Sequence, residues 1–248
     1  MKYIPNFITS LNLASGFVAV IFAANGELMT ASWLILAAMI FDFLDGFSAR
    51  MLKAYSEMGK ELDSLADIVS FGVAPAMILY KLLLPAHQNI DSQAPGFPDF
   101  FAGIIIYVPA LMPVCAALRL AKFNLDLSQS ASFRGLPTPA NAIAVISVIF
   151  AKDLSSMPLV ESFTGSALAV VIYTVVLSSL MVTNIRLLSN KMTTLKFRGN
   201  EGRYILIGLV LISFAAFGFA SAPLIIPFYI LASLIELFFA KRSKNRLA

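Results

Sequence analysis

Long hydrophobic runs alternate with short polar segments along this chain, and each run is about 15–24 residues long. Because about 20 apolar residues in a helix cross a hydrocarbon core of about 30 Å, the pattern is typical of a polytopic membrane protein. It predicts an all-α fold with eight spans, near residues 7–24, 29–52, 62–84, 100–121, 137–151, 164–184, 203–220 and 222–240. We interpret residues 1–248 as one integral-membrane domain, with a core over about 1–190 and two additional helices over about 203–240.

Composition supports a membrane protein and excludes several other classes. Hydrophobic residues make up 59% of the 248 residues and charged residues only 13%. Soluble domains are nearer 45–50% apolar and about 25% charged. The difference excludes most soluble folds, disordered chains and nucleic-acid-binding modules, so no nucleic-acid partner is expected. With one cysteine, Cys115, and one histidine, His87, a single chain cannot build a disulfide framework or a Cys/His zinc site.

The basic residues indicate how the predicted helices are oriented. All 18 Lys and Arg residues except Lys81 and Lys152 fall on one side of the spans. Because cytoplasmic loops carry an excess of Lys and Arg, this side is predicted to be cytoplasmic. Both termini then lie in the cytoplasm and the number of spans is even. Attraction of anionic lipids to the same face is a secondary interpretation.

A cleaved signal peptide is the alternative interpretation of residues 1–24. Polar residues such as Asn6, Thr9 and Asn12 interrupt this segment, whereas the apolar region of a signal peptide rarely tolerates them. We therefore expect residues 1–24 to be a retained first span.

Acidic residues cluster in the second and third predicted spans, where a charge is costly and marks a candidate functional site. Each residue of a helix turns by about 100°, so residues three, four or seven positions apart share a face. The residues that share a face are Asp42, Asp45, Gly46, Ala49 and Arg50 on the second span, and Gly59, Asp63 and Asp67 on the third. Because these spans are consecutive, they are expected to pack as antiparallel neighbours. Four carboxylates then converge just below the cytoplasmic surface.

Four carboxylates in one low-dielectric pocket repel each other unless they are protonated, paired with cations or bound to metal. Ligation by oxygen alone suits Mg²⁺, Mn²⁺ or Ca²⁺. Two divalent ions that share four carboxylates are a common arrangement for phosphoryl chemistry. Gly46, Ala49 and Gly59 leave room for a ligand beside the acids, and Arg50 is placed to pair with a phosphate.

A charge-paired helix hairpin, in which Arg50, Lys53 and Lys60 neutralise the acids, is the alternative interpretation. Buried ion pairs are costly to desolvate and stabilise proteins poorly. This alternative also gives the glycines no purpose, so the ligand site is favoured.

The eight residues resemble the signature of the CDP-alcohol phosphatidyltransferase family, D-x2-D-G-x2-A-R-x8-G-x3-D-x3-D, with every spacing matched. Further segments narrow the resemblance to the membrane-integral phosphatidylserine synthases of that family. They are residues 5–9 with Asn12, 70–76, 118–124, 133–140 and 181–185. One departure is Lys122, because arginine is more usual after Leu-Arg-Leu-Ala, and lysine keeps the charge but lacks the planar fork.

The resemblance implies a metal-dependent transfer of the phosphatidyl group of CDP-diacylglycerol to L-serine, which yields phosphatidylserine and CMP. It implies that one or two divalent ions, Mg²⁺ or Mn²⁺ with Ca²⁺ also suitable, are bound by Asp42, Asp45, Asp63 and Asp67. Asp67 is also the expected general base, since a serine hydroxyl is a weak nucleophile. A homodimer in a prokaryotic cytoplasmic membrane, with its site at the cytoplasmic face, is expected.

The resemblance also suggests roles for other residues. The expected contacts to the nucleotide are Gly46, Ala49, Arg50, Gly59, Ser64, Asn6, Thr9 and Asn12. For the last three, ordinary helix capping and interfacial polarity are an equally good interpretation. Arg119 is the first candidate to bind the serine carboxylate, with Lys122 and Arg134 behind it, and the alternative for Arg119 is a snorkelling anchor at the membrane surface.

Two competing functions remain open. The first is the same chemistry with another acceptor, glycerol 3-phosphate or inositol phosphate, which demands extra cations for a phosphate. The second is an ion- or proton-coupled transporter that uses the acids as an ion path. Transporters place polar groups at the midplane between repeats. Here the acids lie near one membrane face, which favours an enzyme.

Overall fold

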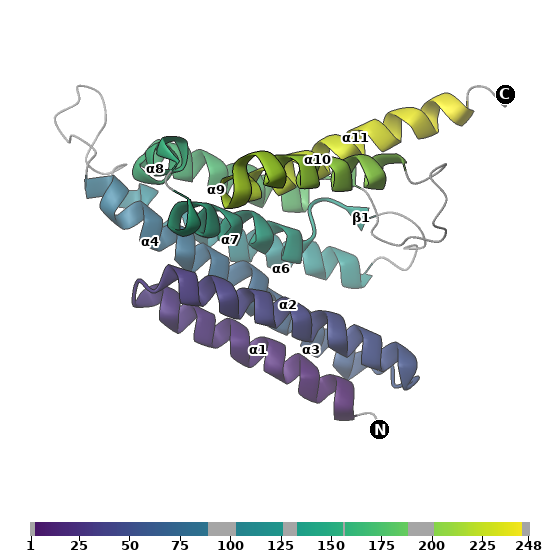
Figure 1. Cartoon of the computed structure of the whole chain (residues 1–248). Helices are drawn as coiled ribbons and strands as arrows, with labels where there is room; N and C mark the ends of the chain where they lie inside the picture. The colour runs from purple at the N-terminus through teal and green to yellow at the C-terminus, as the bar shows by residue number, and fades with distance from the viewer. Residues whose placement is uncertain (1–2, 89–102, 126–132, 156, 188–200, 245–248) are drawn as a thin grey trace.

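A computed structural model describes residues 3–88, 103–125, 133–155, 157–187 and 201–244, and these residues are almost entirely helical (Figure 1). The α-helices are α1 (Tyr3–Ala24), α2 (Leu28–Met51), α3 (Glu57–Asp67), α4 (Ala74–Gln88), α6 (Leu111–Leu125), α7 (Thr138–Leu154), α8 (Pro158–Gly165), α9 (Ala167–Val182), α10 (Glu201–Phe217) and α11 (Ile225–Lys244). A π-helix (Ile68–Val73) joins α3 to α4, and 3-10 turns occupy Val108–Ala110 and Gly218–Leu224. Two short strands, β1 (Phe133–Arg134) and β2 (Arg186–Leu187), pair antiparallel.

Five helical segments are long and apolar enough to cross a membrane, or six if α8 and α9, which are bent by 84°, form one span. One of the five, Gly202–Glu236, folds back on itself: Gly202 at the start of α10 lies beside Glu236 near the end of α11. The predicted fifth span corresponds to α7, which has only 17 residues. The chain is therefore an all-α polytopic membrane protein, as predicted. The count of eight spans stays a prediction.

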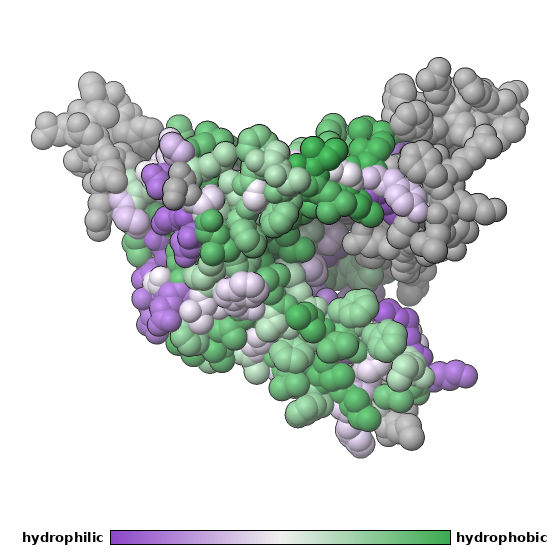
Figure 2. All heavy atoms as spheres, in the orientation of Figure 1, coloured by the Kyte–Doolittle hydropathy of each residue, from purple (hydrophilic) through white to green (hydrophobic). Residues whose placement is uncertain are grey.

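Polar residues gather at the two ends of the bundle, and a broad hydrophobic band lies between them on the face shown in Figure 2. Figure 1 places the start of α1 and the end of α11 at the same end of the bundle. That both termini lie on one side of the membrane stays a prediction. The assignment of that side to the cytoplasm stays a prediction.

Small and polar residues let α1 approach its neighbours closely. Its buried stripe contains Thr9, Asn12, Gly16 and Ala19, and α1 packs against α2, α3 and the π-helix. A Cβ atom at Gly16 would lie 2.6 Å from the Cα of Ser70, so only glycine permits this approach. The Ser70 hydroxyl donates a hydrogen bond of 3.0 Å to the Asn12 carbonyl. The first helix is therefore fixed against the segment that follows Asp67.

The third predicted span is one helical segment with a π-helix in its middle. The π-helix begins directly after Asp67, and such local widening of a helix frequently occurs at functional sites. On its other side it packs against α6, where a Cβ atom at Gly72 would lie 3.2 Å from both Pro113 Cα and Ala116 Cβ. Contacts from both α1 and α6 thus hold the end of α3 in place.

Backbone hydrogen bonds join residues 133–136, before α7, to residues 180–187 at the end of α9, and we call this pairing the strap. The amide of Gly135 donates to the Ile185 carbonyl and that of Leu136 to the Leu180 carbonyl, each at 2.9 Å. Gly135 has a φ of +76°, and a Cβ atom there would lie 2.9 Å from the Thr183 carbonyl oxygen, so this turn requires glycine. The strap fixes where α7 begins.

Candidate active site

Three carboxylates converge where α2 passes α3. Asp42, Asp63 and Asp67 each offer an oxygen atom, and these atoms lie within 4.8 Å of one another. Asp63 and Asp67 share a face because they are four positions apart on α3. Asp42 and Asp63 are half-buried, and Asp67 is only 8% exposed. The structure therefore brings together three of the four predicted carboxylates in one cluster.

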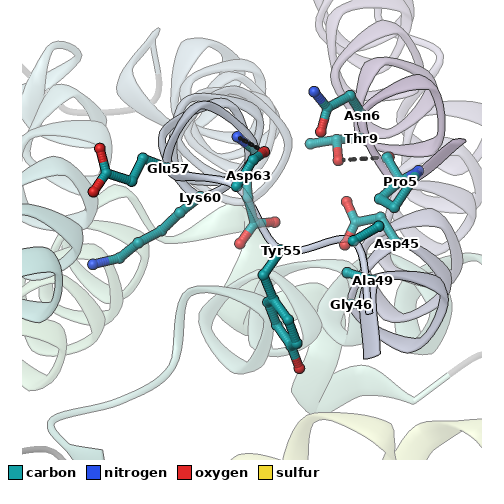
Figure 3. Close-up of a pocket in the computed structure, with 13 residues that line it drawn as sticks. Pro5, Asn6, Thr9, Asp45, Gly46, Ala49, Tyr55, Glu57, Lys60 and Asp63 are labelled. Atoms are coloured by element: carbon teal, nitrogen blue, oxygen red, sulfur yellow. Dashed lines mark hydrogen bonds between the residues drawn. The ribbon is translucent and has the colours of Figure 1, made fainter. Parts of the chain in front are cut away.

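The fourth carboxylate, Asp45, is buried but stands outside the three-residue cluster. It lines a cavity of about 540 Å³, which we call the first cavity, and points into it near Thr9 (Figure 3). Three positions along α2 leave the two side chains about 60° apart around the helix, so Asp45 and Asp42 point toward different cavities. The predicted set of four is thus divided into a cluster and one neighbour.

Several oxygen atoms of these acids are buried with no hydrogen-bond partner among the described residues. They are Oδ2 of Asp45, Oδ1 of Asp63 and Oδ1 of Asp67. A buried carboxylate oxygen without a partner is costly unless a proton or a cation neutralises it. A donor set made only of carboxylate oxygens fits a hard divalent cation. The acids of this site therefore suit a divalent metal.

Thr138 fixes the orientation of Asp67. Its hydroxyl, at the start of α7, donates a buried hydrogen bond of 3.2 Å to Oδ2 of Asp67. The strap between β1 and β2 determines where α7 begins, so it also determines where this hydroxyl lies. Oδ2 of Asp67 is thereby held in place, and Oδ1 remains available to a proton or a metal ion.

The first cavity is lined by α1, α2, α3 and the link between α2 and α3 (Figure 3). Its lining residues are Pro5, Asn6, Thr9, Asp45, Gly46, Ala49, Ala54, Tyr55, Ser56, Glu57, Gly59, Lys60 and Asp63. Seven of them belong to the predicted nucleotide or metal sets, namely Asn6, Thr9, Asp45, Gly46, Ala49, Gly59 and Asp63. The predicted faces of α1, α2 and α3 therefore do meet around one cavity.

Gly59 lies where α3 passes close to Asn6 of α1. A Cβ atom there would lie 3.0 Å from Oδ1 of Asn6 and 2.9 Å from Oγ of Ser56. The Ser56 hydroxyl caps α3 by accepting a hydrogen bond of 3.0 Å from the Gly59 amide. Glycine at this position keeps the wall of the first cavity open while the helix start stays capped.

Three residues predicted to contact the nucleotide lie elsewhere. Arg50 is exposed and lies outside the lining of the first cavity, with its Nη1 atom 3.8 Å from a Cβ atom built on Gly46. Asn12 is fully buried deeper along α1. Ser64 lines the cavity on the other side of α3. Their roles toward a nucleotide stay predictions.

A second cavity of about 600 Å³ lies on the other side of the carboxylates. Asp42, Asp63 and Asp67 line it together with Arg119 from α6 and Thr138 from α7. Asp63 and Lys60 line both cavities, so the two cavities meet at α3. The Arg119 side chain is half-buried, and its Nε atom has no hydrogen-bond partner among the described residues. This cavity therefore combines acids with one semi-buried cation.

Of the other two predicted serine-binding cations, the structure describes the side chain of Lys122 alone. Lys122 is exposed and lines neither cavity. The Arg134 backbone pairs with Arg186 across the two strands, and its side chain lies outside the described residues. Of the two candidates whose side chains the structure describes, Arg119 lies beside the acids and Lys122 does not.

Sequence reasoning missed two residues of the second cavity, Thr138 and Tyr229. Thr138 belongs to the segment 133–140 quoted above, so a signal was present without a role. Tyr229 lies in an apolar final helix whose pattern does not distinguish it from its neighbours. Asn124 at the end of α6 connects to α3: it donates a hydrogen bond of 3.0 Å to Ser64, and its carbonyl accepts one of 3.1 Å from Lys60.

Comparison with known proteins identifies the family. Residues 2–240 match the family model described as CDP-alcohol phosphatidyltransferase. A CDP-diacylglycerol–serine O-phosphatidyltransferase from Bacillus subtilis is 34% identical over 186 residues, which cover 75% of this chain and 90% of that protein. One of the same name from Mycobacterium bovis is 33% identical over 256 residues, covering 100% of this chain and 81% of the relative. Another from Mycobacterium leprae is 38% identical over 159 residues, covering 61% of this chain and about half, 48%, of that protein.

Proposed function

Because this chain belongs to the CDP-alcohol phosphatidyltransferase family, we propose that it transfers the phosphatidyl group of CDP-diacylglycerol to L-serine. The names of the Bacillus and Mycobacterium relatives support serine as the acceptor. The observation that carries the proposal is the pair of cavities that meet at Asp63, beside Asp42 and Asp67. A nucleotide-linked lipid and a small alcohol need separate entrances that lead to one phosphorus atom.

The two cavities suit different halves of the reaction. The first cavity, with Gly46, Ala49 and Gly59 in its wall, offers room for the cytidine nucleotide. The second, with Arg119 and Asp67, offers a cation and a base for the amino acid. The serine oxygen attacks the phosphatidyl phosphorus, the bond from that phosphorus to CMP breaks, and the serine hydroxyl proton passes to a carboxylate.

One or two divalent ions, Mg²⁺ or Mn²⁺ with Ca²⁺ also suitable, fit this donor set. Asp42, Asp63 and Asp67 would hold one, and Asp45 would contribute from the side of the first cavity. Such an ion supplies positive charge that offsets the charge on the pyrophosphate and on the departing CMP.

Asp67 is the proposed general base. Thr138 holds its Oδ2 atom, while its buried Oδ1 atom has no hydrogen-bond partner among the described residues. A positioned carboxylate that takes the proton during attack typically contributes about 100- to 10,000-fold to the rate. Direct attack by serine requires no nucleophile from the protein.

Arg119 is the proposed partner of the serine carboxylate. Replacing it by alanine is expected to raise the KM for serine about 10- to 100-fold, since hydrogen bonds between charged groups contribute ~1.5–3 kcal/mol. The KM for CDP-diacylglycerol should change less than twofold. Lys122→Ala is the matched control, because Lys122 is exposed and lines neither cavity. An Arg119→Ala variant with an unchanged serine KM would reject this role.

The enzyme is integral to the membrane, and its proposed site lies at the cytoplasmic face of a prokaryotic cytoplasmic membrane. The acids support this position because they lie on α2 and α3 near the link that joins those helices. A homodimer is also proposed, from the family resemblance. Cross-linking of the protein in native membranes tests the homodimer. If only a band at the monomer mass remained after cross-linking, the homodimer would be contradicted.

The deciding experiment supplies the purified full-length protein with CDP-diacylglycerol, Mg²⁺ or Mn²⁺, and one labelled alcohol at a time. The alcohols are L-serine, glycerol 3-phosphate and inositol phosphate, and the measurement is CMP release with formation of labelled lipid. Serine-dependent release supports the proposal. Release only with another alcohol assigns the same chemistry to a different acceptor. Absence of release with every alcohol rejects the transferase and favours the ion-coupled transporter.

A further inference from the structure

The C-terminal hairpin α10–α11 lies beyond the predicted core, yet it forms part of the second cavity. Leu206 from α10 and Ile225, Ile226 and Tyr229 from α11 line the cavity together with Arg119. In Figure 1 the hairpin lies over α7, and α11 and the turn before it pack against that helix. The acceptor side of the site is therefore closed by helices that the family signature does not include.

Tyr229 is the polar member of this wall. Its side chain is only 8% exposed, and the other three hairpin residues that line the cavity are aliphatic. A buried tyrosine hydroxyl normally has a polar partner. Tyr229 and Asp67 line this cavity together with Arg119, and both are close enough to its guanidinium for an electrostatic effect. The guanidinium of Arg119 thus lies near a carboxylate on α3 and a tyrosine on α11.

The position of Arg119 matters because a guanidinium and a carboxylate readily form an ion pair with two parallel hydrogen bonds. Such a pair between Arg119 and Asp67 would occupy the cation that the acceptor needs and the carboxylate that takes its proton. Attraction between opposite charges is strong in a cavity from which water is partly excluded. A second partner on another helix opposes this closure and keeps the guanidinium available to an acceptor.

We propose that Tyr229 is a positioning residue that holds the Arg119 guanidinium for the carboxylate of the acceptor, so that the C-terminal hairpin determines acceptor selectivity. The proposal rests on the proposed function, in which the second cavity takes the acceptor. It implies that the hairpin favours an alcohol that carries a carboxylate over one that carries only an amine. Ethanolamine is the suitable probe, because it shares the alcohol and amine of serine but lacks the carboxylate.

The test compares Tyr229→Phe with the unmodified full-length protein. Phenylalanine keeps the ring in the cavity wall and removes only the hydroxyl. Leu231→Ala and Leu234→Ala are the matched controls, because these α11 side chains are 48% and 49% exposed and line neither cavity. The measurements are kcat and KM for serine and for CDP-diacylglycerol, and kcat/KM for ethanolamine.

The expected result for Tyr229→Phe is a serine KM raised about tenfold, with the KM for CDP-diacylglycerol within twofold. The value of kcat/KM for ethanolamine should stay unchanged, so the preference for serine over ethanolamine falls by the same factor. The two control variants should keep the original preference.

Two outcomes would overturn the inference. Equal losses with serine and ethanolamine, or a raised KM for CDP-diacylglycerol, would assign Tyr229 to packing alone. An unchanged serine KM would exclude any role in acceptor binding. If the unmodified protein released no CMP with serine, the proposed function itself would fail. Serine-dependent release that is insensitive to Tyr229→Phe would overturn only this inference.

Discussion

At the scale of single residues, Asp67 combines three properties that rarely coincide. It is almost fully buried, one of its oxygen atoms accepts a hydrogen bond from Thr138, and its carboxylate lies within reach of Asp42 and Asp63. Burial strengthens every electrostatic interaction of the carboxylate. The hydrogen bond restricts which oxygen atom can receive a proton. Asp67 is therefore the residue at which the smallest change should have the largest effect.

Replacing Asp67 by asparagine keeps its shape and removes its basicity. We expect kcat to fall about 100- to 10,000-fold, because general-base assistance is lost. Binding of CDP-diacylglycerol should largely survive, as measured by equilibrium binding of the labelled lipid. Asp153→Asn is the control, since Asp153 is exposed at the far end of α7 and lines neither cavity. Turnover that stays unchanged in Asp67→Asn would remove this residue from the mechanism.

Gly59 tests the first cavity with the addition of a single methyl group. In Gly59→Ala the new Cβ atom would lie 3.0 Å from Oδ1 of Asn6 and 2.9 Å from Oγ of Ser56, so these two side chains, which line the first cavity, must shift. Overpacking typically costs about 1–3 kcal/mol. We expect the KM for CDP-diacylglycerol to rise about tenfold, with the serine KM unchanged. Gly208→Ala is the control, because a Cβ atom there meets nothing within 4 Å; an equal rise in both variants would contradict a local effect.

At the scale of helices, the site depends on how α1 and α6 hold the π-helix. Its residues Ser70 and Gly72 contact α1 and α6 through small side chains, and the π-helix begins one residue after Asp67. A wider turn changes the angular position of everything that follows it along the helix. The face of α3 that carries Asp63 and Asp67 is thus set independently of the face by which α4 packs into the core.

The contact between Gly16 and Ser70 is expected to be critical for this arrangement. In Gly16→Ala the new Cβ atom would lie 2.6 Å from the Cα of Ser70, which a change of rotamer cannot relieve. We expect the melting temperature in detergent to fall, with a destabilisation of about 1–3 kcal/mol. Transfer activity at a temperature where the variant is folded should fall as well, because the end of α3 shifts. A variant as stable and active as Gly208→Ala would contradict the proposed role of this contact.

At the scale of the whole molecule, the two cavities are bordered by elements from opposite ends of the chain. The link between α2 and α3 borders the first cavity, and the hairpin α10–α11 closes the second. The starts of α1 and α3 and the end of α11 lie at one end of the bundle in Figure 1. On the face shown in Figure 2, a broad band of hydrophobic surface lies between the two ends of the bundle.

The orientation of the molecule can be tested with single cysteines. Because Cys115 is the one native cysteine, Cys115→Ala provides a cysteine-free background. The suitable positions lie at opposite ends of the bundle. Asn25→Cys lies in the exposed turn between α1 and α2, and Met58→Cys lies at an exposed position near the start of α3. In intact cells a membrane-impermeant maleimide should label only Asn25→Cys, while a permeant one labels both. Labelling of only Met58→Cys would invert the orientation.

The sequence by itself determined the fold class and the convergence of three acids from α2 and α3. These are local properties: hydrophobic length decides whether a segment can span a membrane, and helical periodicity decides which side chains share a face. Prediction succeeded for Asp42, Asp63 and Asp67 because two consecutive helices are enough to bring them together.

Only the tertiary structure decided which residues from distant helices complete the site. Asp45 stands apart from the other acids, Ser64 faces the second cavity, and the π-helix interrupts the third predicted span. Tyr229 lines the second cavity with Arg119, although the two residues are more than one hundred positions apart along the chain. Such contacts depend on where small residues allow helices to approach, and hydropathy and spacing within one helix do not encode the packing between helices.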